Sequence, residues 1–212
     1  LFEDIKNNKE PIEADIAKLK EIIEEWKAEA QRRGLDCETR TPIIIDNYLS
    51  DNTIKMFSST GVLSSAELQS RCEVKWENYS PKLQIESRVL GDMVINHVLP
   101  AAKQYQSILL EKVVRLQQAF GTEEATSLNE QDCLLIRRIE SHASAIIAGV
   151  DKMTKLRMTA NHIENQRDRA IAFHDTVVPV MKDIRKHVDE LEMWVDDQLW
   201  TLPKYRELLF IR

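Results

Sequence analysis

Apolar residues recur every three or four positions along most of this chain, a spacing that is typical of amphipathic helices. The first apolar stripe predicts a helix over residues 11–33 and contains Ile12, Ile16, Leu19, Ile23, Trp26 and Ala30. Pro11 suits the first turn of that helix, which needs no N–H group, and Gly34 suits the left-handed residue after its last turn. We interpret the stripe as a face packed on a core, although its spacing also fits a coiled-coil seam.

The helical pattern loosens between residues 35 and 61. Residues 42–47 indicate an extended or loop segment that enters a turn. Ser50 then precedes a short apolar repeat and is expected to cap a short helix, which Gly61 ends. The part of the chain before Pro81 is expected to be mixed but rich in helix.

Two helix starts are expected next along the chain. Ser64 and Glu67 have the Ser-x-x-Glu spacing of a capping box, which predicts a helix that continues to Tyr79. Ser80 and Pro81 suit the N-cap and the first position of a further, long helix.

Pro100 interrupts the apolar repeat of this long helix. Proline removes one backbone hydrogen bond, so we expect a kink or break near Asn96. The repeat then resumes until Gly121, which predicts the end of the helix.

Residues 121–129 predict a polar connection, and Ser127 with Glu130 predicts a second capping box. The following helix is predicted from a heptad-spaced stripe of Ile136, Ile139, Ala143, Ile146, Val150, Met153, Arg157 and Ala160. Residues 161–165 are a weak candidate for a break, and Pro179 is the next clear disturbance.

A final amphipathic helix is predicted from Val180, Ile184, Val188, Leu191 and Val195. The apolar tail over residues 200–211 is expected to dock on the rest of the chain. Taken together, the pattern predicts a mainly α fold, in which long antiparallel helices form a bundle or extended helical hairpin, preceded by a mixed helix-rich segment.

Composition narrows the class of protein. Hydrophobic residues make up 43% and charged residues 30% of the 212 residues, which is a globular balance, and five glycines and six prolines are too few for a β-rich fold. The net charge of −6 comes from interleaved acidic and basic residues, which argues against a nucleic-acid partner. No apolar run is long enough to span a membrane. Three widely spaced cysteines indicate free thiols in a reducing compartment, so we expect a cytoplasmic protein.

Candidate chemistry is sparse. The five histidines form no HExxH motif, and no Glu-x-x-His pair of the di-metal bundles occurs. Glu140 and His142 are two residues apart and point to different helix faces, whereas Asp183 and His187 are four apart and are expected to form a weak surface pair. The tryptophans are interpreted as core or interface anchors, namely Trp26, Trp76, Trp194 and Trp200. We therefore predict no catalytic, cofactor-binding or metal-binding residue in this chain.

Four segments in order carry a more specific signal. They are RGLDCETRTPIIIDN at residues 33–47, TGVLS at 60–64, QIESRVLGDM at 84–93 and LPKYRELLF at 202–210. Together they resemble the C-terminal third of type III glutamine synthetases, over a stretch from about Trp26 to the end.

The resemblance implies a parent enzyme that condenses glutamate with ammonium, using ATP and Mg²⁺ or Mn²⁺, in a homo-oligomer of stacked hexameric rings. In that family the metal-binding glutamates and phosphate-binding arginines lie on barrel strands that precede the region matched here. Residues 1–93 would be the closing helical part of the catalytic domain, and residues 94–212 the type III-specific extension. The fragment would support the rest of the subunit by packing and assembly, and would be inactive alone.

Two other hypotheses stay open from the sequence. The chain could be a stand-alone helical scaffold for protein–protein interaction without enzymatic activity. A metal-dependent helical oxidoreductase is a weaker third option.

Overall fold

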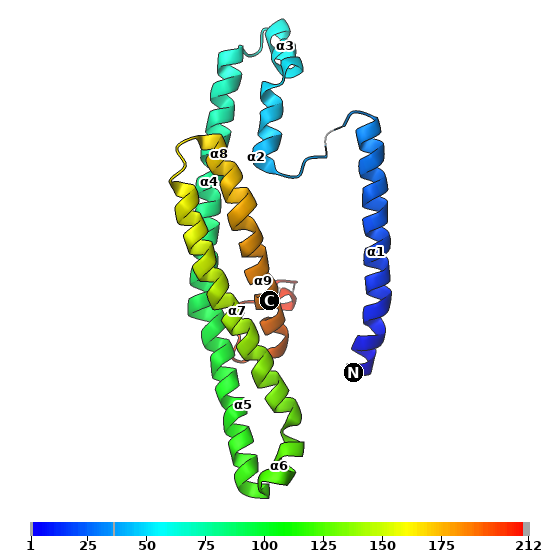
Figure 1. Cartoon of the computed structure of the whole chain (residues 1–212), viewed down its shortest axis with the longest axis vertical. Coiled ribbons are helices and arrows are strands. Elements are labelled where there is room, and N and C mark those ends of the chain that lie inside the picture. The colour runs from blue at the N-terminus through cyan, green and yellow to red at the C-terminus, as the bar shows by residue number, and fades with distance from the viewer. Residues whose placement is uncertain (1, 36, 210–212) are drawn as a thin grey trace. The chain divides into compact units, whose positions relative to one another are not determined.

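The computed structural model describes residues 2–35 and 37–209, with side chains from residue 15 onward except those of residues 205 and 206. Helices joined by short connections make up this part of the chain, and no strand occurs in it (Figure 1). The mainly α prediction is thereby confirmed. The chain divides into two compact units, Leu1–Ile44 and Ile45–Arg212.

Unit 1 contains the long helix α1 (Phe2–Arg32). The helix begins earlier than the predicted start at Pro11, because residues 2–10 contain no glycine or proline to stop it. Its end agrees with the prediction. Gly34 has a φ of 72°, its N–H donates to Gln31 O (3.0 Å), and the Leu35 N–H donates to Ala30 O (2.9 Å). This pair of bonds is a Schellman motif, which satisfies carbonyls of the last turn.

The apolar stripe of α1 does not pack on a core as expected. The exposed fractions of its large side chains within the described chain are 45% for Ile16, 57% for Leu19, 49% for Ile23 and 64% for Trp26. Among the described side chains of the stripe, Ala30 alone is buried. Within unit 1, this face is therefore left uncovered.

The expected extended segment at residues 42–47 is helical instead. It comprises α2 (Thr41–Ile44) and the 3₁₀ helix η1 (Ile45–Leu49). The Ile43 and Ile44 N–H groups both donate to Arg40 O, at 2.9 and 3.1 Å, so the chain turns from its first residues. Pro42 lies in this first turn, where proline is tolerated, and burial of Ile45 outweighs the strand preference of the isoleucine run.

The caps of the next two helices agree with the sequence. Helix α3 (Asp51–Thr60) begins after Ser50, whose Oγ accepts a bond from Thr53 N (3.4 Å), and ends at Gly61 with a φ of 67°. Helix α4 (Ser65–Met93) begins with the predicted capping box. Ser64 and Glu67 exchange bonds, because Ser64 N donates to the Glu67 carboxylate (2.7 Å) and Glu67 N donates to Ser64 Oγ (3.3 Å).

Helix α4 continues through Pro81, so the second helix start predicted at Ser80 is wrong. Ser80 is buried, and its hydroxyl has no hydrogen-bond partner among the described residues. A single proline removes one backbone bond, and the packing of both halves of α4 on neighbouring helices keeps the helix continuous.

The predicted disturbance before Pro100 is a π-helical segment. Helix α4 passes into η2 (Val94–Val98) and then into α5 (Leu99–Phe120) without a break in the helix. The wider turn closes with Leu99 N donating to Val94 O. It leaves Val94 and Val98 buried in the core.

The chain reverses at the far end of α5. Gly121 (φ 76°) ends α5, and the predicted polar connection contains the short helix α6 (Thr122–Leu128) before α7 (Glu130–Asn161) begins. The predicted Ser127–Glu130 capping box is absent, because Ser127 belongs to α6 and Asn129 precedes α7. The Asn129 side chain is buried and donates to Val113 O (3.4 Å) instead of capping.

The weak break candidate at residues 161–165 is a real break. Helix α7 ends at Asn161, and Asn165 caps α8 (Gln166–Ala172) by accepting from Asp168 N (3.0 Å). As before Pro100, the residues before Pro179 form a π-helical segment, which separates α8 from the last long helix. These elements are η3 (Phe173–Val177) and α9 (Val178–Trp194).

Unit 2 is therefore a bundle of long antiparallel helices, in which α7 packs against α5 and α9 (Figure 1). Each of the long helices contributes buried apolar side chains, including Leu68, Leu109, Ile139, Ile146, Ile184 and Leu191. The predicted last amphipathic helix is confirmed, since Val180, Ile184 and Leu191 are buried.

The tail docks only in part. Trp200 is buried against the bundle core, and Leu202 packs beside it. Helix α10 (Tyr205–Leu209) carries Leu208 and Leu209, which are exposed. Residues 210 and 211 of the expected tail lie outside the described residues.

Candidate functional site

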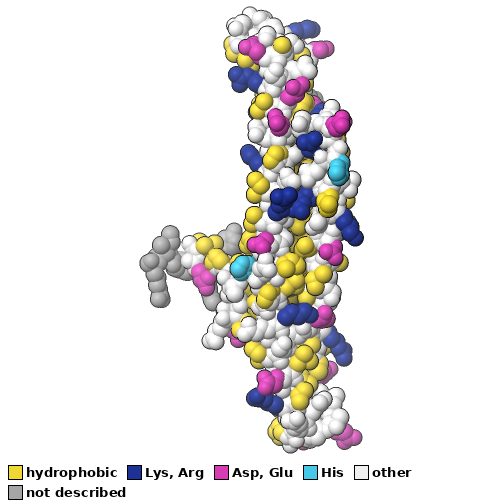
Figure 2. Space-filling model, turned by 90° about the vertical axis from the view of Figure 1, so that its left-hand side faces the viewer, with side chains coloured by type: hydrophobic (Ala, Val, Ile, Leu, Met, Phe, Trp, Pro, Cys, Tyr) yellow, Lys and Arg dark blue, Asp and Glu magenta, His cyan; other side chains and the backbone are white. Residues whose placement is uncertain are grey.

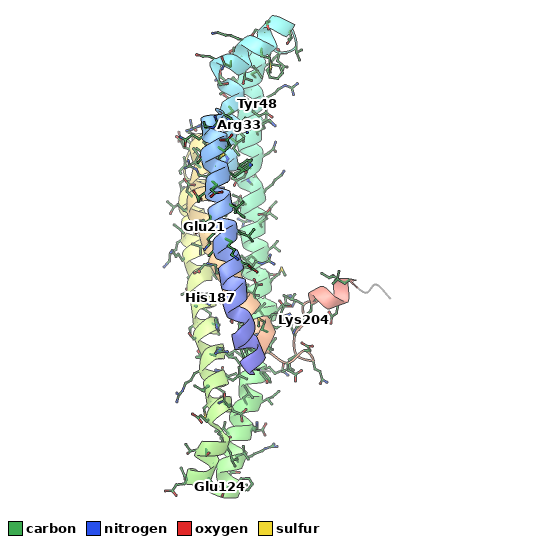
Figure 3. The ribbon with its side chains drawn as sticks, turned by 90° about the vertical axis from the view of Figure 1, so that its right-hand side faces the viewer. Glu21, Arg33, Tyr48, Glu124, His187 and Lys204 are labelled. Atoms are coloured by element: carbon green, nitrogen blue, oxygen red, sulfur yellow. The ribbon has the colours of Figure 1, made fainter. Side chains whose placement is uncertain are left out.

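A groove lies at the α3–α4 end of unit 2. Its volume is about 750 Å³, and its walls come from η1, α3 and the first turns of α4. The apolar lining includes Tyr48, Phe57, Leu63, Leu68 and Val74. Tyr48 lies where η1 meets this groove (Figure 3). A volume of this size matches that of a docking groove or ligand cleft.

Basic side chains border the groove. Lys75 Nζ lies 5.1 Å from the centre of the Tyr48 ring, a cation–π distance, and Arg71 lies on the same helix one turn earlier. The acidic side chain in the lining is Glu67, whose carboxylate is held by the Ser64 cap, and these hydrogen bonds lower the pKa of that carboxyl. The groove is thus apolar with a cationic rim.

Two histidines meet across the seam between α7 and α9. His142 Nδ1 lies 2.9 Å from His187 Nδ1, and the two half-buried rings are tilted by 57°. The distance is that of a hydrogen bond, so one ring donates a proton and the other accepts it. His187 lies on the side of α9 shown in Figure 3.

The surroundings of this pair hold His142 in its neutral form. Burial is the main cause that lowers the pKa of His142, and the neighbouring His187 and Arg138 add to it, while Glu190 opposes it. One turn further along the seam, the Arg138 guanidinium stacks over the Trp194 ring at 4.5 Å. This seam therefore gathers aromatic and titratable groups from α7 and α9.

A second polar contact ties α4 to the π-helical segment η3. The Tyr79 hydroxyl and His174 Nδ1 are 2.7 Å apart, although they are far apart in the sequence. Burial raises the pKa of Tyr79, and the acidic Glu86 and Asp175 act in the same direction. The phenol therefore stays protonated and bonded at neutral pH.

The structure differs from the sequence-based expectation in one pairing of side chains and in one of the tryptophans. His187, expected to pair with Asp183 on the surface, contacts His142 instead, because the side chains of α7 and α9 interdigitate. Trp76 and Trp200 are buried as the anchor interpretation requires, whereas Trp26 is exposed.

Metal-binding groups do not converge in the described part of the chain, since no cluster of three or more His, Cys, Asp or Glu side chains occurs there. None of the described helices is long and apolar enough to cross a membrane. The free thiols are those of Cys37, Cys72 and Cys133, and burial raises the pKa of Cys72.

Sequence reasoning missed both histidine contacts and the groove. His142 was considered only with its chain neighbour Glu140, and His174 had no marked partner. Their partners lie on helices that are distant in sequence, so only the register of α7 against α9, and of α4 against η3, brings them together.

Comparison with known proteins identifies relatives over nearly the whole chain. A family model described as glutamine synthetase C-terminal domain matches residues 21–117. A glutamine synthetase from Bacteroides fragilis (strain YCH46) is 43% identical over 189 residues, which are 89% of this chain and 26% of that protein. The type-3 glutamine synthetase of Dictyostelium discoideum is 31% identical over 188 residues, again 89% of this chain and 26% of the relative.

A glutamine synthetase from Butyrivibrio fibrisolvens is 25% identical over 192 residues, 88% of this chain and 26% of its own length. The chain thus spans about a quarter of the length of each of these relatives. The region that matches lies in their C-terminal part. By these matches the chain is similar to the C-terminal part of glutamine synthetases.

Proposed function

We propose that this chain is the C-terminal helical part of a type III glutamine synthetase, a cytoplasmic enzyme that ligates ammonium to glutamate with ATP. The observation that supports this most directly is the 31% identity to a type-3 enzyme across 89% of the chain. The residues that hold ATP and the divalent cation belong, on this proposal, to the rest of the subunit.

The chain's own contribution is packing and assembly. Its α1 helix presents a row of exposed apolar side chains, and the α3–α4 groove adds a second unfilled apolar surface. Exposed apolar side chains also occur along α4 and α7, including Ile85, Val89 and Met158. Figure 2 shows hydrophobic side chains spread over one face of unit 2. Surfaces of this kind mark contacts with other protein surfaces. We assign them to the catalytic part of the same subunit and to neighbouring subunits in stacked hexameric rings.

Within the chain, residues 1–93 would complete the catalytic domain and residues 94–212 would form the type III extension. Phosphoryl transfer needs cations and cationic clamps that converge on one place, and on this proposal those groups lie in the rest of the subunit. We therefore assign no catalytic, cofactor-binding or metal-binding residue to this chain.

The parent gene provides the test. Sequencing upstream of the codon for Leu1 should reveal a catalytic domain in the same reading frame, and a start codon adjacent to Leu1 would instead favour a stand-alone scaffold. Expressed with and without residues 94–212, the parent subunit should lose its high-mass assembly when the extension is removed. An unchanged mass distribution in the truncated subunit would contradict the assembly role.

A further inference from the structure

The contact between His142 and His187 joins two imidazole rings, and imidazole is the side chain whose ordinary pKa lies nearest to neutral pH. The two rings come from the long helices α7 and α9, which pack against each other. The geometry of this contact depends on how many protons the two rings carry, because the two facing Nδ1 atoms share one hydrogen.

The proton count follows from the chemistry of imidazole. With one ring as the neutral acceptor, the other can donate from Nδ1 whether it is neutral or carries an extra proton. A second extra proton leaves both Nδ1 atoms as donors, and two cations then face each other at 2.9 Å in a half-buried seam. The bond is lost at that step and repulsion replaces it.

Charged groups nearby come from both helices. Arg138 on α7 adds positive charge beside His142, and Glu190 on α9 partly offsets it. Burial acts in the same direction as Arg138, so the seam resists the second proton until the solution is acidic. Protonation then acts against the packing of α9 on α7.

The last turns of α9 also hold the tail. Trp194 lies two turns beyond His187 and stacks under Arg138, and Lys204 of the tail donates to Glu192 O (3.0 Å) and pairs with Asp197. Lys204 lies beside the end of α9 in Figure 3. Loosening at the histidine pair therefore reaches the tail through groups that are in direct contact.

We propose that the His142–His187 contact is a pH-sensitive switch, which loosens the last turns of α9 and the tail from α7 when the pH falls through the range of histidine titration. This inference is independent of the proposed function, because it uses only contacts inside unit 2.

Hydrogen exchange measured by mass spectrometry between pH 7.5 and 5.5 tests the switch, after correction for the intrinsic exchange rate. In peptides from the last turns of α9, the opening equilibrium should be about fivefold larger at the lower pH. This change equals the loss of about one net hydrogen bond. The double variant His142→Gln/His187→Gln should show no such pH dependence. His97→Gln, which alters an exposed histidine, should behave as the unchanged protein.

A constant degree of opening in the unchanged chain, or the same pH dependence in the double variant, would overturn the proposal. Imidazole NMR of the unchanged chain gives a second readout, which does not rely on the double variant folding. The His142 resonance should titrate at lower pH than in His187→Gln, because the imidazole of His187 lowers the pKa of His142 and an uncharged glutamine does not. Identical midpoints in the two proteins would also overturn the proposal.

Discussion

Arg167 on α8 and Asp46 on η1 form a bidentate ion pair that joins the start of unit 2 to the short helix α8. Arg167 Nε donates to Asp46 Oδ1 (2.7 Å) and Nη2 donates to Oδ2 (2.6 Å). The hydrogen bonds that Arg167 donates to the Asp46 carboxylate raise the pKa of Arg167, which favours its charged form. The pair fixes η1 beside α4 and α8, and so helps to set one wall of the α3–α4 groove.

Replacing Arg167 with alanine should therefore lower the free energy of unfolding by about 1 kcal/mol, a modest value because both side chains are partly exposed. Chemical denaturation followed by circular dichroism measures this change. Arg185→Ala is the matched control, since Arg185 and Asp189 form an exposed pair at 3.7 Å on one helix. Equal losses of unfolding free energy in the two variants would show that the bidentate geometry adds nothing to stability.

Gly149 allows α7 to approach α9 closely. A Cβ atom built at Gly149 lies 2.7 Å from Ile184 Cγ1, whereas one at Gly91 has its nearest contact at 3.6 Å. Gly149→Ala should destabilise the bundle by about 1–3 kcal/mol through overpacking. Gly91→Ala should be neutral or stabilising by up to about 1 kcal/mol, because alanine favours the helix. Thermal unfolding of both variants checks the prediction, and a stable Gly149→Ala variant would contradict the observed packing.

Tyr79 should ionise at higher pH than exposed tyrosines. Burial raises its pKa in the folded chain, so the folded state holds this proton more tightly than the unfolded state. The stability that depends on this proton is present below the unfolded pKa of about 10 and is lost as the pH rises above it. Ultraviolet absorbance titration should show a late-ionising tyrosine that disappears in Tyr79→Phe. A Tyr79→Phe curve that superimposes on that of the unchanged chain would refute the assignment.

The exposed stripe of α1 should matter for assembly and not for the fold of unit 2. Leu19→Glu places a charge on the stripe, while Lys20→Glu places one on an exposed site of the same helix outside it. In the whole subunit, light scattering should show a smaller assembly for Leu19→Glu, because a charge cannot be buried without cost. Lys20→Glu should assemble normally. Assemblies of equal size in the two variants would show that α1 is not part of the interface.

Local sequence signals predicted the fold well at positions where a single residue sets the backbone conformation. Gly34, Gly61 and Gly121 end helices with positive φ, and Ser64 with Glu67 forms the capping box that its spacing indicates. Pro100 was correctly expected to disturb its helix. The form of the disturbance, a π-helical segment with Val94 and Val98 buried, was not predicted.

Signals that depend on tertiary context were less informative. Ser80 with Pro81 has the sequence of a helix start, yet the helix runs through it because its two halves pack on different neighbours. The isoleucine run of residues 43–45 has strand preference but is helical where Ile45 is buried. The His142–His187 contact needs the register of two helices, which no local pattern contains.

On the proposed function, this chain supports glutamine synthesis without carrying the chemistry itself. The most direct test is a glutamine-formation assay on the purified 212-residue chain with glutamate, ammonium, ATP and Mg²⁺, beside the complete parent subunit. The account predicts glutamine from the parent alone and none above background from the chain. Glutamine made by the isolated chain would contradict it.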